Sequence, residues 1–186
     1  MKKILKTVYK LLNIAYRFFN KVFIVPGIKA SFGECGRNVR ISYDFDMRGE
    51  ENIYVGDNTQ IGPHSLFWTT KARIIIGKKV LMGPHITIIT GDHRTDIIGK
   101  YIADISENEK SPKCDEDVVI EDGEWLGANV TILKGVHVGK ESIIAANSVL
   151  TKDVEAYSVY AGIPAKKIKN RFTIEELEKH KMDYSQ

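Results

Sequence analysis

Residues 120–155 repeat every six positions. Divided into sixes, they read IEDGEW, LGANVT, ILKGVH, VGKESI, IAANSV and LTKDVE. The first position of every six is aliphatic, and the fourth is mostly Gly, Asn or Asp, which tolerate a left-handed or turn backbone. A period of six fits neither the 3.6 period of a helix nor the alternation of a long strand. It predicts short strands separated by turns, stacked as the coils of a parallel β-helix.

The repeat extends upstream and breaks once. Earlier sets of apolar residues six apart are Ile41, Met47 and Ile53, then Val55, Ile61 and Phe67, then Ile76, Met82 and Ile88. The register ends at Gly91, and residues 92–117 are polar and without repeat. A long loop inside a compact repeat protein is usually functional or disordered. We therefore expect the loop to form one wall of a pocket.

Length and composition set the broad class. A chain of 186 residues fits one domain with short attachments, and a net charge of +3 gives no argument for nucleic acid. The two cysteines, Cys35 and Cys114, are isolated from each other and from any His cluster. They provide neither a disulfide framework nor a metal-binding spacing. We expect a cytoplasmic protein without a metal.

Residues 1–24 differ from the rest of the chain. They contain six Lys or Arg and no acid, and their polar residues recur three or four apart, as on one face of a helix. The apolar run is too short for a transmembrane span or a signal peptide. Two interpretations remain open: the helix packs on the β-helix or a neighbouring subunit, or it lies on an anionic membrane surface. Pro26 and Gly27 are expected to end the segment.

The C-terminal part closes the repeat. Residues 156–169 are expected to cross the end of the coil, and Thr173 and Glu176 form a capping box that begins a short charged helix over 173–180. The predicted organisation is an N-terminal helical segment at 1–28, a β-helix domain at 29–172 containing the loop 92–117, and a helix and tail at 173–186.

One of the five histidines has an unusual position. His64 and His85 fall at turn positions of the repeat, His137 at its sixth position, and His180 in the charged tail, where we expect it to be solvated. His93 instead follows the break directly, in Thr-Gly-Asp-His-Arg. Imidazole is the side chain best suited to take a proton from a hydroxyl near neutral pH. His93 is therefore the candidate catalytic base.

The sixes also resemble a known family. The phrase DGEWLGANVTILKGV and the ending AANSVLTKDV, followed by AGIPAK, are similar to the hexapeptide-repeat acyltransferases over about residues 35–172. The branch that looks most similar is the sugar O-acetyltransferases, which includes galactoside, maltose and polysaccharide-modifying enzymes. The resemblance implies a left-handed β-helix, a homotrimer, acetyl-CoA bound between adjacent subunits, and a sugar or glycan acceptor.

The resemblance also implies roles for particular residues. His93 matches the family's base, although this chain has an extra Asp92 and has Arg94 where the motif has Pro. Trp125 matches a residue at the edge of the site, and Ser65 lies roughly where the family has an Asn near the reacting centre. The positions that match acetyl-CoA contacts are Ala128, Ala146, Thr151, Lys152, Lys166 and Lys169.

Three alternatives stay open at this stage. The acceptor could be an amine, as in amino-sugar or antibiotic acetyltransferases, although the Asn-His motif usual in the antibiotic branch is absent. The chain could be a non-catalytic β-helix scaffold, against which the combined presence of His93, Trp125, Thr151 and Lys152 argues. A γ-class carbonic anhydrase shares the fold, but the spacing of His64, His85 and His93 does not match its zinc ligands. The basic start of the chain indicates a glycan made at the inner membrane face.

Overall fold

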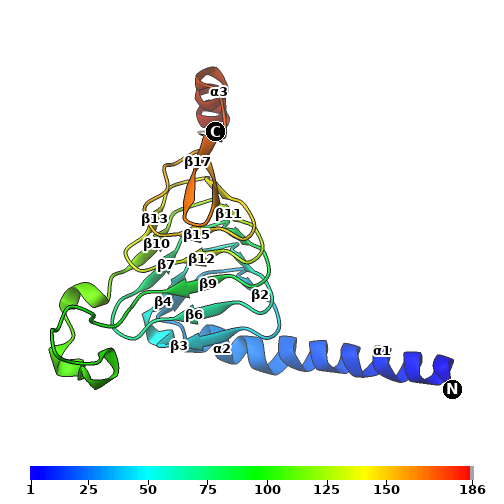
Figure 1. Cartoon of the computed structure of the whole chain (residues 1–186). Helices are drawn as coiled ribbons and strands as arrows, with labels where there is room; N and C mark the ends of the chain where they lie inside the picture. The colour runs from blue at the N-terminus through cyan, green and yellow to red at the C-terminus, as the bar shows by residue number, and fades with distance from the viewer. Residues whose placement is uncertain (185–186) are drawn as a thin grey trace.

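The computed structural model describes residues 1–184 and shows a three-sided β-helix with a helix at each end (Figure 1). The first face is a sheet of β1 (Glu34–Cys35), β4 (Ile53–Val55), β7 (Ile74–Ile76), β10 (Val118–Ile120) and β13 (His137–Val138). The third face is a sheet of β3 (Asp46–Arg48), β6 (Leu66–Trp68), β9 (Thr87–Ile89), β12 (Thr131–Ile132) and β15 (Val149–Leu150). We call them sheets A and C.

Sheet B is the second face and the longest. It contains β2 (Arg40–Ile41), β5 (Gln60–Ile61), β8 (Leu81–Met82), β11 (Trp125–Leu126), β14 (Ile143–Ile144), β16 (Ser158–Gly162) and β17 (Ala165–Asn170). The chain visits A, B and C in turn, so that strands adjacent in a sheet belong to successive coils and pair in parallel. Only β17 pairs antiparallel among the strands of the described residues, on β16, where it ends the sheet. The predicted parallel β-helix is thereby confirmed.

The hexad pattern explains the core. The first-position residues are at most 1% exposed: Ile120, Leu126, Ile132, Val138, Ile144 and Leu150. Fourth-position residues take positive φ at the corners: Gly123, Asn129, Gly135, Glu141 and Asn147. The fifth position also faces inward, as buried Val130, Val136 and Ser148 show. One residue in three therefore fills the interior, and the others face outward or form corners.

The N-terminal helix is longer than expected. α1 (Lys2–Phe19) continues through one π-helical turn, η1 (Asn20–Ile24), into α2 (Val25–Ser31). The prediction that Pro26 and Gly27 end the helical segment is wrong. Pro26 lies in the first turn of α2, where its missing N–H matters least, and the Val25 N–H bonds to the Asn20 carbonyl across the π turn. No helix within residues 1–184 combines the length and apolar character needed to cross a bilayer.

The C-terminal elements attach to the last coils. The capping box is present: the Thr173 N–H donates to Glu176 at 2.8 Å and the Glu176 N–H to the Thr173 hydroxyl at 3.2 Å, so that α3 (Ile174–Tyr184) begins as predicted. The expectation of a solvated His180 is wrong, because its Nε2 lies 2.6 Å from the Glu141 carboxylate, which Arg171 also contacts. These contacts dock α3 on the corner between sheets A and B.

Candidate active site

The extruded loop leaves the β-helix at the corner between sheets C and A. It connects β9 to β10 and contains three short 3-10 helices, η3 (Ile102–Asp104), η4 (Glu107–Glu109) and η5 (Pro112–Cys114); a fourth, η2 (Glu50–Asn52), occupies the same corner two coils earlier. The two ends of the extruded loop form a neck where the loop joins the coils. Gly91 and Asp115 make an antiparallel bridge, the Asp92 N–H bonds to the Cys114 carbonyl at 2.8 Å, and the Glu116 N–H bonds to Thr90 at 2.9 Å. His93 is thus the first residue beyond a closed neck.

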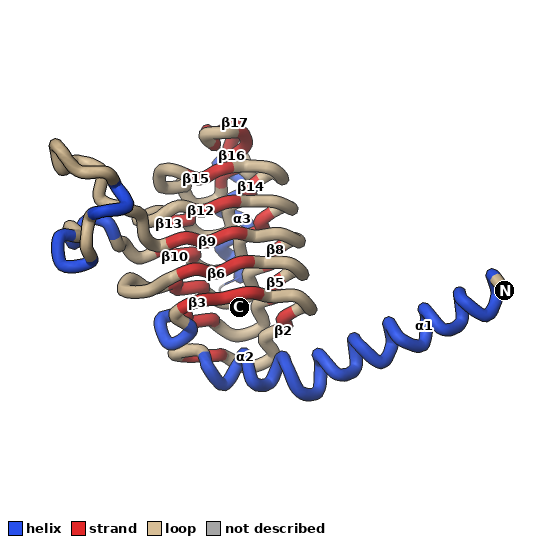
Figure 2. Tube along the Cα trace, turned by 60° about the horizontal axis from the view of Figure 1, so that its bottom comes forward, coloured by secondary structure: helices blue, strands red, loops and turns tan. Residues whose placement is uncertain are grey.

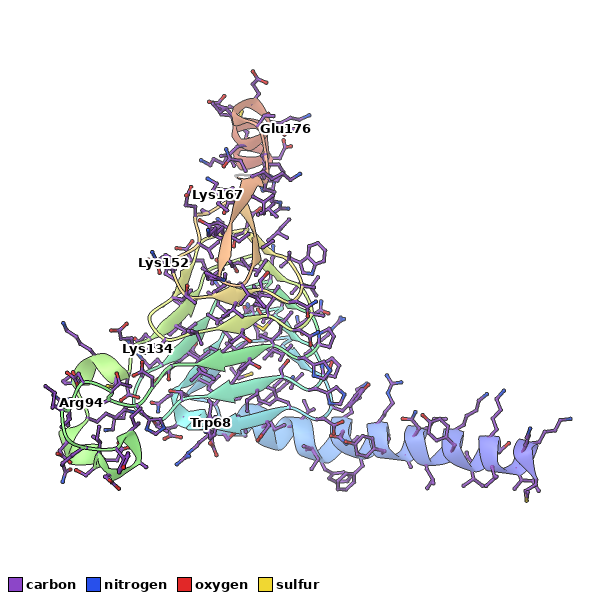
Figure 3. The ribbon with its side chains drawn as sticks, viewed as in Figure 1. Trp68, Arg94, Lys134, Lys152, Lys167 and Glu176 are labelled. Carbon is purple, nitrogen blue, oxygen red and sulfur yellow. The ribbon has the colours of Figure 1, made fainter. Side chains whose placement is uncertain are left out.

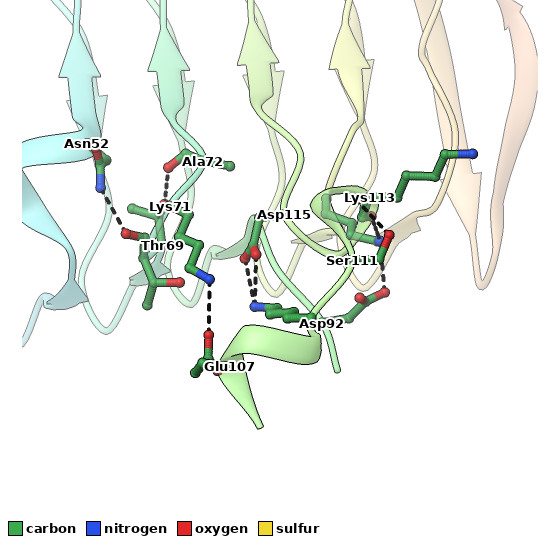
Figure 4. A network of polar contacts seen from close by, with 12 residues as sticks. Asn52, Thr69, Lys71, Ala72, Asp92, Glu107, Ser111, Lys113 and Asp115 are labelled. Carbon is green, nitrogen blue, oxygen red and sulfur yellow. Dashed lines mark hydrogen bonds and ion pairs between the residues drawn. The ribbon is translucent and has the colours of Figure 1, made fainter. Parts of the chain in front are cut away.

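Ion pairs hold the loop against the coils (Figure 4). Lys110 lies 2.9 Å from Asp115, and both side chains are largely buried, at 14% and 8% exposed. Lys71, from the preceding coil, lies 3.1 Å from Glu107. Asp92 pairs with Lys134 of the next coil at 3.0 Å, and Lys134 also donates to the Lys113 carbonyl. The loop is therefore tied to coils on both sides, and its neck is tied to the coil of Lys134.

His93 is exposed and faces a mixed-charge surface. Within residues 1–184 its ring has no hydrogen-bond partner, so both nitrogens are free to meet a substrate. Glu107 is close enough for His93 to act on it by charge. The pKa of Glu107 is held below its ordinary value mainly by its hydrogen bond from Lys71, with Lys110 and His93 contributing. An imidazole in this setting can accept a proton from a hydroxyl.

The predicted residues Thr151 and Lys152 lie along the same corner as Lys134, which was not predicted. Lys134, Thr151 and Lys152 each follow a strand of sheet C and precede the next passage through face A. Figure 3 shows Lys134 and Lys152 on the edge of the prism above the loop that carries Arg94. Thr151 and Lys152 are exposed. The corner thus carries the candidate base His93 together with two cations, Lys134 and Lys152, on successive coils.

The other predicted residues lie elsewhere on the prism. Trp125 begins β11 in sheet B and is 52% exposed, beside Leu81 of the previous coil. Ala128 and Ala146 stand one above the other at the corner between sheets B and C, since each follows a sheet B strand and precedes a sheet C strand. Lys166 and Lys169 are exposed on β17.

One chain therefore carries two separate groups of predicted site residues. His93, Thr151 and Lys152 belong to the corner between sheets C and A, whereas Trp125 and the two alanines belong to sheet B and its far corner. A single copy does not bring the two groups together. Two copies placed side by side could do so, as the corner of one would face sheet B of the next. No three His, Cys, Asp or Glu side chains in the described chain are grouped so as to hold a metal ion.

Ser65 needs a correction. Its side chain is 1% exposed, and its hydroxyl donates to the Gly62 carbonyl at 2.9 Å and accepts from the Ile86 N–H at 3.3 Å. It points into the coil and cannot reach a substrate on the outer surface. The register contains the reason: Ile61 occupies the first position of its six, so Ser65 occupies the fifth, which faces inward. His64 and His85 face outward at the corner between sheets B and C. Their rings stack with 4.9 Å between the ring centroids.

Sequence reasoning also missed the residues that position the loop. Lys134 and Asp92 lie 42 residues apart in the chain, and no local pattern indicates their pairing. Lys110 and Asp115 are five apart, but a helical spacing does not account for them because the intervening residues form a 3-10 turn. Buried Glu124 occupied a fifth position and was detectable from the register, as Ser65 was.

Comparison with known proteins places the chain in a family. The model described as bacterial transferase hexapeptide, six repeats, matches residues 117–152. "Putative acetyltransferase YJL218W" of Saccharomyces cerevisiae is 33% identical over 142 residues, which cover 76% of this chain and 68% of the relative. The chain belongs to the hexapeptide-repeat acyltransferases. The family and the enzyme class that the resemblance implied are confirmed.

Other relatives differ in their named acceptors. "Probable macrolide acetyltransferase" of Lysinibacillus sphaericus is 40% identical over 55% of this chain and 66% of its own length. "Galactoside O-acetyltransferase" of Lactococcus lactis is 32% identical over 74% of this chain and 62% of its own length. The chain thus spans about two thirds of the length of these relatives. A sugar O-acetyltransferase is among them, as the resemblance implied.

A solved structure shares both the fold and the co-substrate. The hexapeptide-repeat acetyltransferase VCA0836 of Vibrio cholerae, solved in complex with acetyl coenzyme A, superimposes with a TM-score of 0.68 at 30% identity, covering 78% of this chain and 75% of that one. Its bound ligand is the co-substrate that the sequence predicts.

Proposed function

We propose that the protein transfers an acetyl group from acetyl-CoA to a hydroxyl of a sugar or glycan. The observation that carries the proposal is the placement of His93: exposed, beyond a closed loop neck, on a corner that also carries Thr151 and Lys152. Membership of the hexapeptide acyltransferases supports the acetyl donor. The galactoside relative supports the acceptor class.

The reaction follows from a free imidazole beside an acceptor hydroxyl. The basic nitrogen of His93 removes the hydroxyl proton while the oxygen attacks the thioester carbonyl carbon. The carbon–sulfur bond then breaks, the acetyl group remains on the acceptor oxygen, and the CoA sulfur takes the proton from His93. General-base assistance of this kind contributes about 10²–10⁴-fold to the rate. Direct attack requires no acyl-enzyme.

The split between the two residue groups supports a site shared by neighbouring copies in a homotrimer. The corner that carries His93 would face the sheet B surface of the next copy, where Trp125 and Leu81 form an exposed apolar strip. Such a strip suits the pantetheine arm of CoA. Lys166 and Lys169 on β17 are exposed cations that suit its phosphates. Ala128 and Ala146 allow close approach of the arm. The proposal includes a cytoplasmic location, because acetyl-CoA is supplied there.

A macrolide hydroxyl is the second candidate acceptor, because the macrolide relative is 40% identical to this chain. A macrolide hydroxyl would be acetylated by the same reaction, with His93 as the base. An amine acceptor would use it too, with the amine nitrogen as the attacking atom.

The test is release of free CoA thiol from acetyl-CoA with a panel of acceptors. The panel contains free sugars, nucleotide sugars, lipid-linked glycans, amino sugars and a macrolide. We expect acceptor-dependent thiol release with at least one sugar hydroxyl and none with His93→Gln. Release only with the macrolide or an amine would overturn the acceptor class. No release with any acceptor, in a protein that binds acetyl-CoA, would favour a scaffold.

A further inference from the structure

Helix α1 is fully exposed along its length. None of its 18 residues is buried, and its large apolar side chains stand in solvent, including Leu11 at 62%, Phe18 at 62% and Ile4 at 68% exposed. Figures 1 and 2 show α2 at the base of the prism and α1 projecting outward from it, away from the coils. An apolar surface of this extent on a soluble chain marks an interaction site.

The part of the apolar face that carries Leu11 and Phe18 is turned away from the β-helix. Contacts to the body come from one side of the helix: Tyr16 bonds to Asp44 and packs edge-on against Tyr43, and Asn20 is buried at the junction. At 100° per residue, Leu11 and Phe18 lie about half a turn from that side. The helix therefore cannot cover its apolar face on its own body.

The charge of the segment is one-sided. Residues 1–33 carry seven Lys or Arg and no acid, and the first carboxylate along the chain is Glu34. Lys3, Lys6, Lys10 and Arg17 follow one stripe of α1, beside the apolar face. This combination of a polybasic stripe and a wide apolar face matches an anionic bilayer surface.

A basic pocket lies where α1 joins the first coil. It has a volume of about 660 Å³, and its cationic lining residues are Arg17, Lys21, Lys29 and Arg40. No Asp or Glu lines it. Lys29 donates to the Val39 carbonyl, which holds its ammonium at the wall. The apolar lining residues include Val25, Pro26, Val39 and Ile41, and Asn20, Ser42 and Tyr43 add polar groups. Cations beside apolar side chains suit a phosphate attached to a lipid.

We propose that α1 docks the protein on an anionic membrane surface and that this pocket holds a phospholipid phosphate. An interfacial helix buries its apolar face near the boundary between head groups and acyl chains, so its opposite side lies at the level of the phosphates. The pocket is lined by residues of the helical segment and of the first coil, which brings its cations close to α1. The β-helix then stands on the cytoplasmic side of the surface. The proposal holds whichever acceptor the enzyme uses.

Vesicle co-sedimentation of the full-length protein tests the helix. We expect binding to vesicles of phosphatidylcholine mixed with phosphatidylglycerol and little to phosphatidylcholine alone. Leu11→Ser with Phe18→Ser should weaken binding at least tenfold. Ile98→Ser with Ile174→Ser removes two apolar side chains elsewhere that are even more exposed, and it should leave vesicle binding unchanged. Equal, negligible binding to both vesicle types would overturn the proposal.

Two single-charge variants test the pocket. Arg40→Gln removes a pocket cation that is not on the helix, and Lys140→Gln removes an exposed cation from a late coil. We expect about a fivefold loss of anionic-vesicle binding for the first and none for the second. Equal effects would show general electrostatics and overturn the phosphate site.

If Leu11→Ser with Phe18→Ser instead changes the oligomeric state and leaves vesicle binding intact, α1 contacts another copy, which would overturn the membrane proposal.

Discussion

Asp92 and Lys134 form an ion pair of 3.0 Å that joins the loop neck to the corner of the following coil. Asp92 immediately precedes His93, and the same Lys134 ammonium donates to the Lys113 carbonyl in η5, which leads back into the neck. One side chain thus links both ends of the loop to the rigid coil. This ion pair therefore fixes the position of His93 along the corner between sheets C and A.

Lys134→Met should therefore affect catalysis more than stability. The pair is partly exposed, at 25% and 53%, and such pairs contribute about 0–1 kcal/mol. Misplacement of His93 should lower kcat about three- to tenfold while KM for acetyl-CoA stays unchanged. Steady-state kinetics and thermal unfolding measure both. Lys71→Met, which breaks the pair to Glu107 away from the neck, is the matched control and should leave kcat nearly unchanged.

The buried pair of Lys110 and Asp115 should govern whether the loop neck stays closed. Lys110→Met leaves the Asp115 carboxylate, 8% exposed, without its partner, which costs about 3 kcal/mol of local stability. Hydrogen exchange at residues 90–93 and 114–117 should accelerate. Lys100→Met breaks a pair to Glu109 whose side chains are 42% and 35% exposed, and it should leave exchange at the neck unchanged. Equal exchange in both variants would contradict the anchoring role.

Glu124 should make stability fall as the pH rises. Its side chain is fully buried, and neither carboxylate oxygen has a hydrogen-bond partner in the described residues. Burial raises the pKa of Glu124 from 4.5 to about 8, with the charges of Asp122 and Glu121 adding to the rise. The folded state then holds the proton more tightly than the unfolded state. The stabilisation is complete below about pH 4.5 and is lost as the pH approaches 8.

Glu124→Gln should remove this slope. Between pH 5 and 8 the wild type should lose about 1.4 kcal/mol per pH unit relative to the variant, a total of about 3 kcal/mol or more. The pH dependence of stability is compared rather than the absolute stability, because the side-chain amide introduced by Glu124→Gln is also buried without hydrogen-bond partners. Urea unfolding at several pH values gives both curves. Parallel curves would show that Glu124 is ionised in the folded protein.

Mixed oligomers test the proposed homotrimer and its site between copies. The His93→Ala and Trp125→Ala proteins should each be inactive or severely impaired on their own. Co-expressed at equal levels, they should recover about one quarter of wild-type activity, because one interface in four pairs an intact His93 with an intact Trp125 from the neighbour. No recovery would show that both residues act within one chain.

The repeat predicted the coil because one simple requirement recurs in it. A first-position side chain must fill the interior, and Ile120 and Leu126 do so at no more than 1% exposed. Corner residues need a positive φ, which even Glu141 adopts at its turn. Strict application of the same register would have placed Ser65 and Glu124 inside the coil.

The remaining features depend on contacts between distant parts of the chain. The 3.0 Å pair of Asp92 and Lys134 crosses from the loop to another coil, and the His180 contact to Glu141 spans 39 residues. The continuation of the helix past Pro26 depended on a π turn that has no sequence signature of its own. The separation of His93 from Trp125 follows from which sheet each hexad enters, which the period of six does not specify.

The most direct test of the central claim is His93→Gln assayed for acetyl transfer and for acetyl-CoA binding. The ring of His93 has no hydrogen-bond partner in residues 1–184, so the substitution should leave the fold and thermal stability unchanged. The proposal predicts a fall in kcat of about 10²–10⁴-fold, with acetyl-CoA binding by calorimetry nearly unaltered. Wild-type kcat in the folded variant would contradict the assignment of His93 as the base.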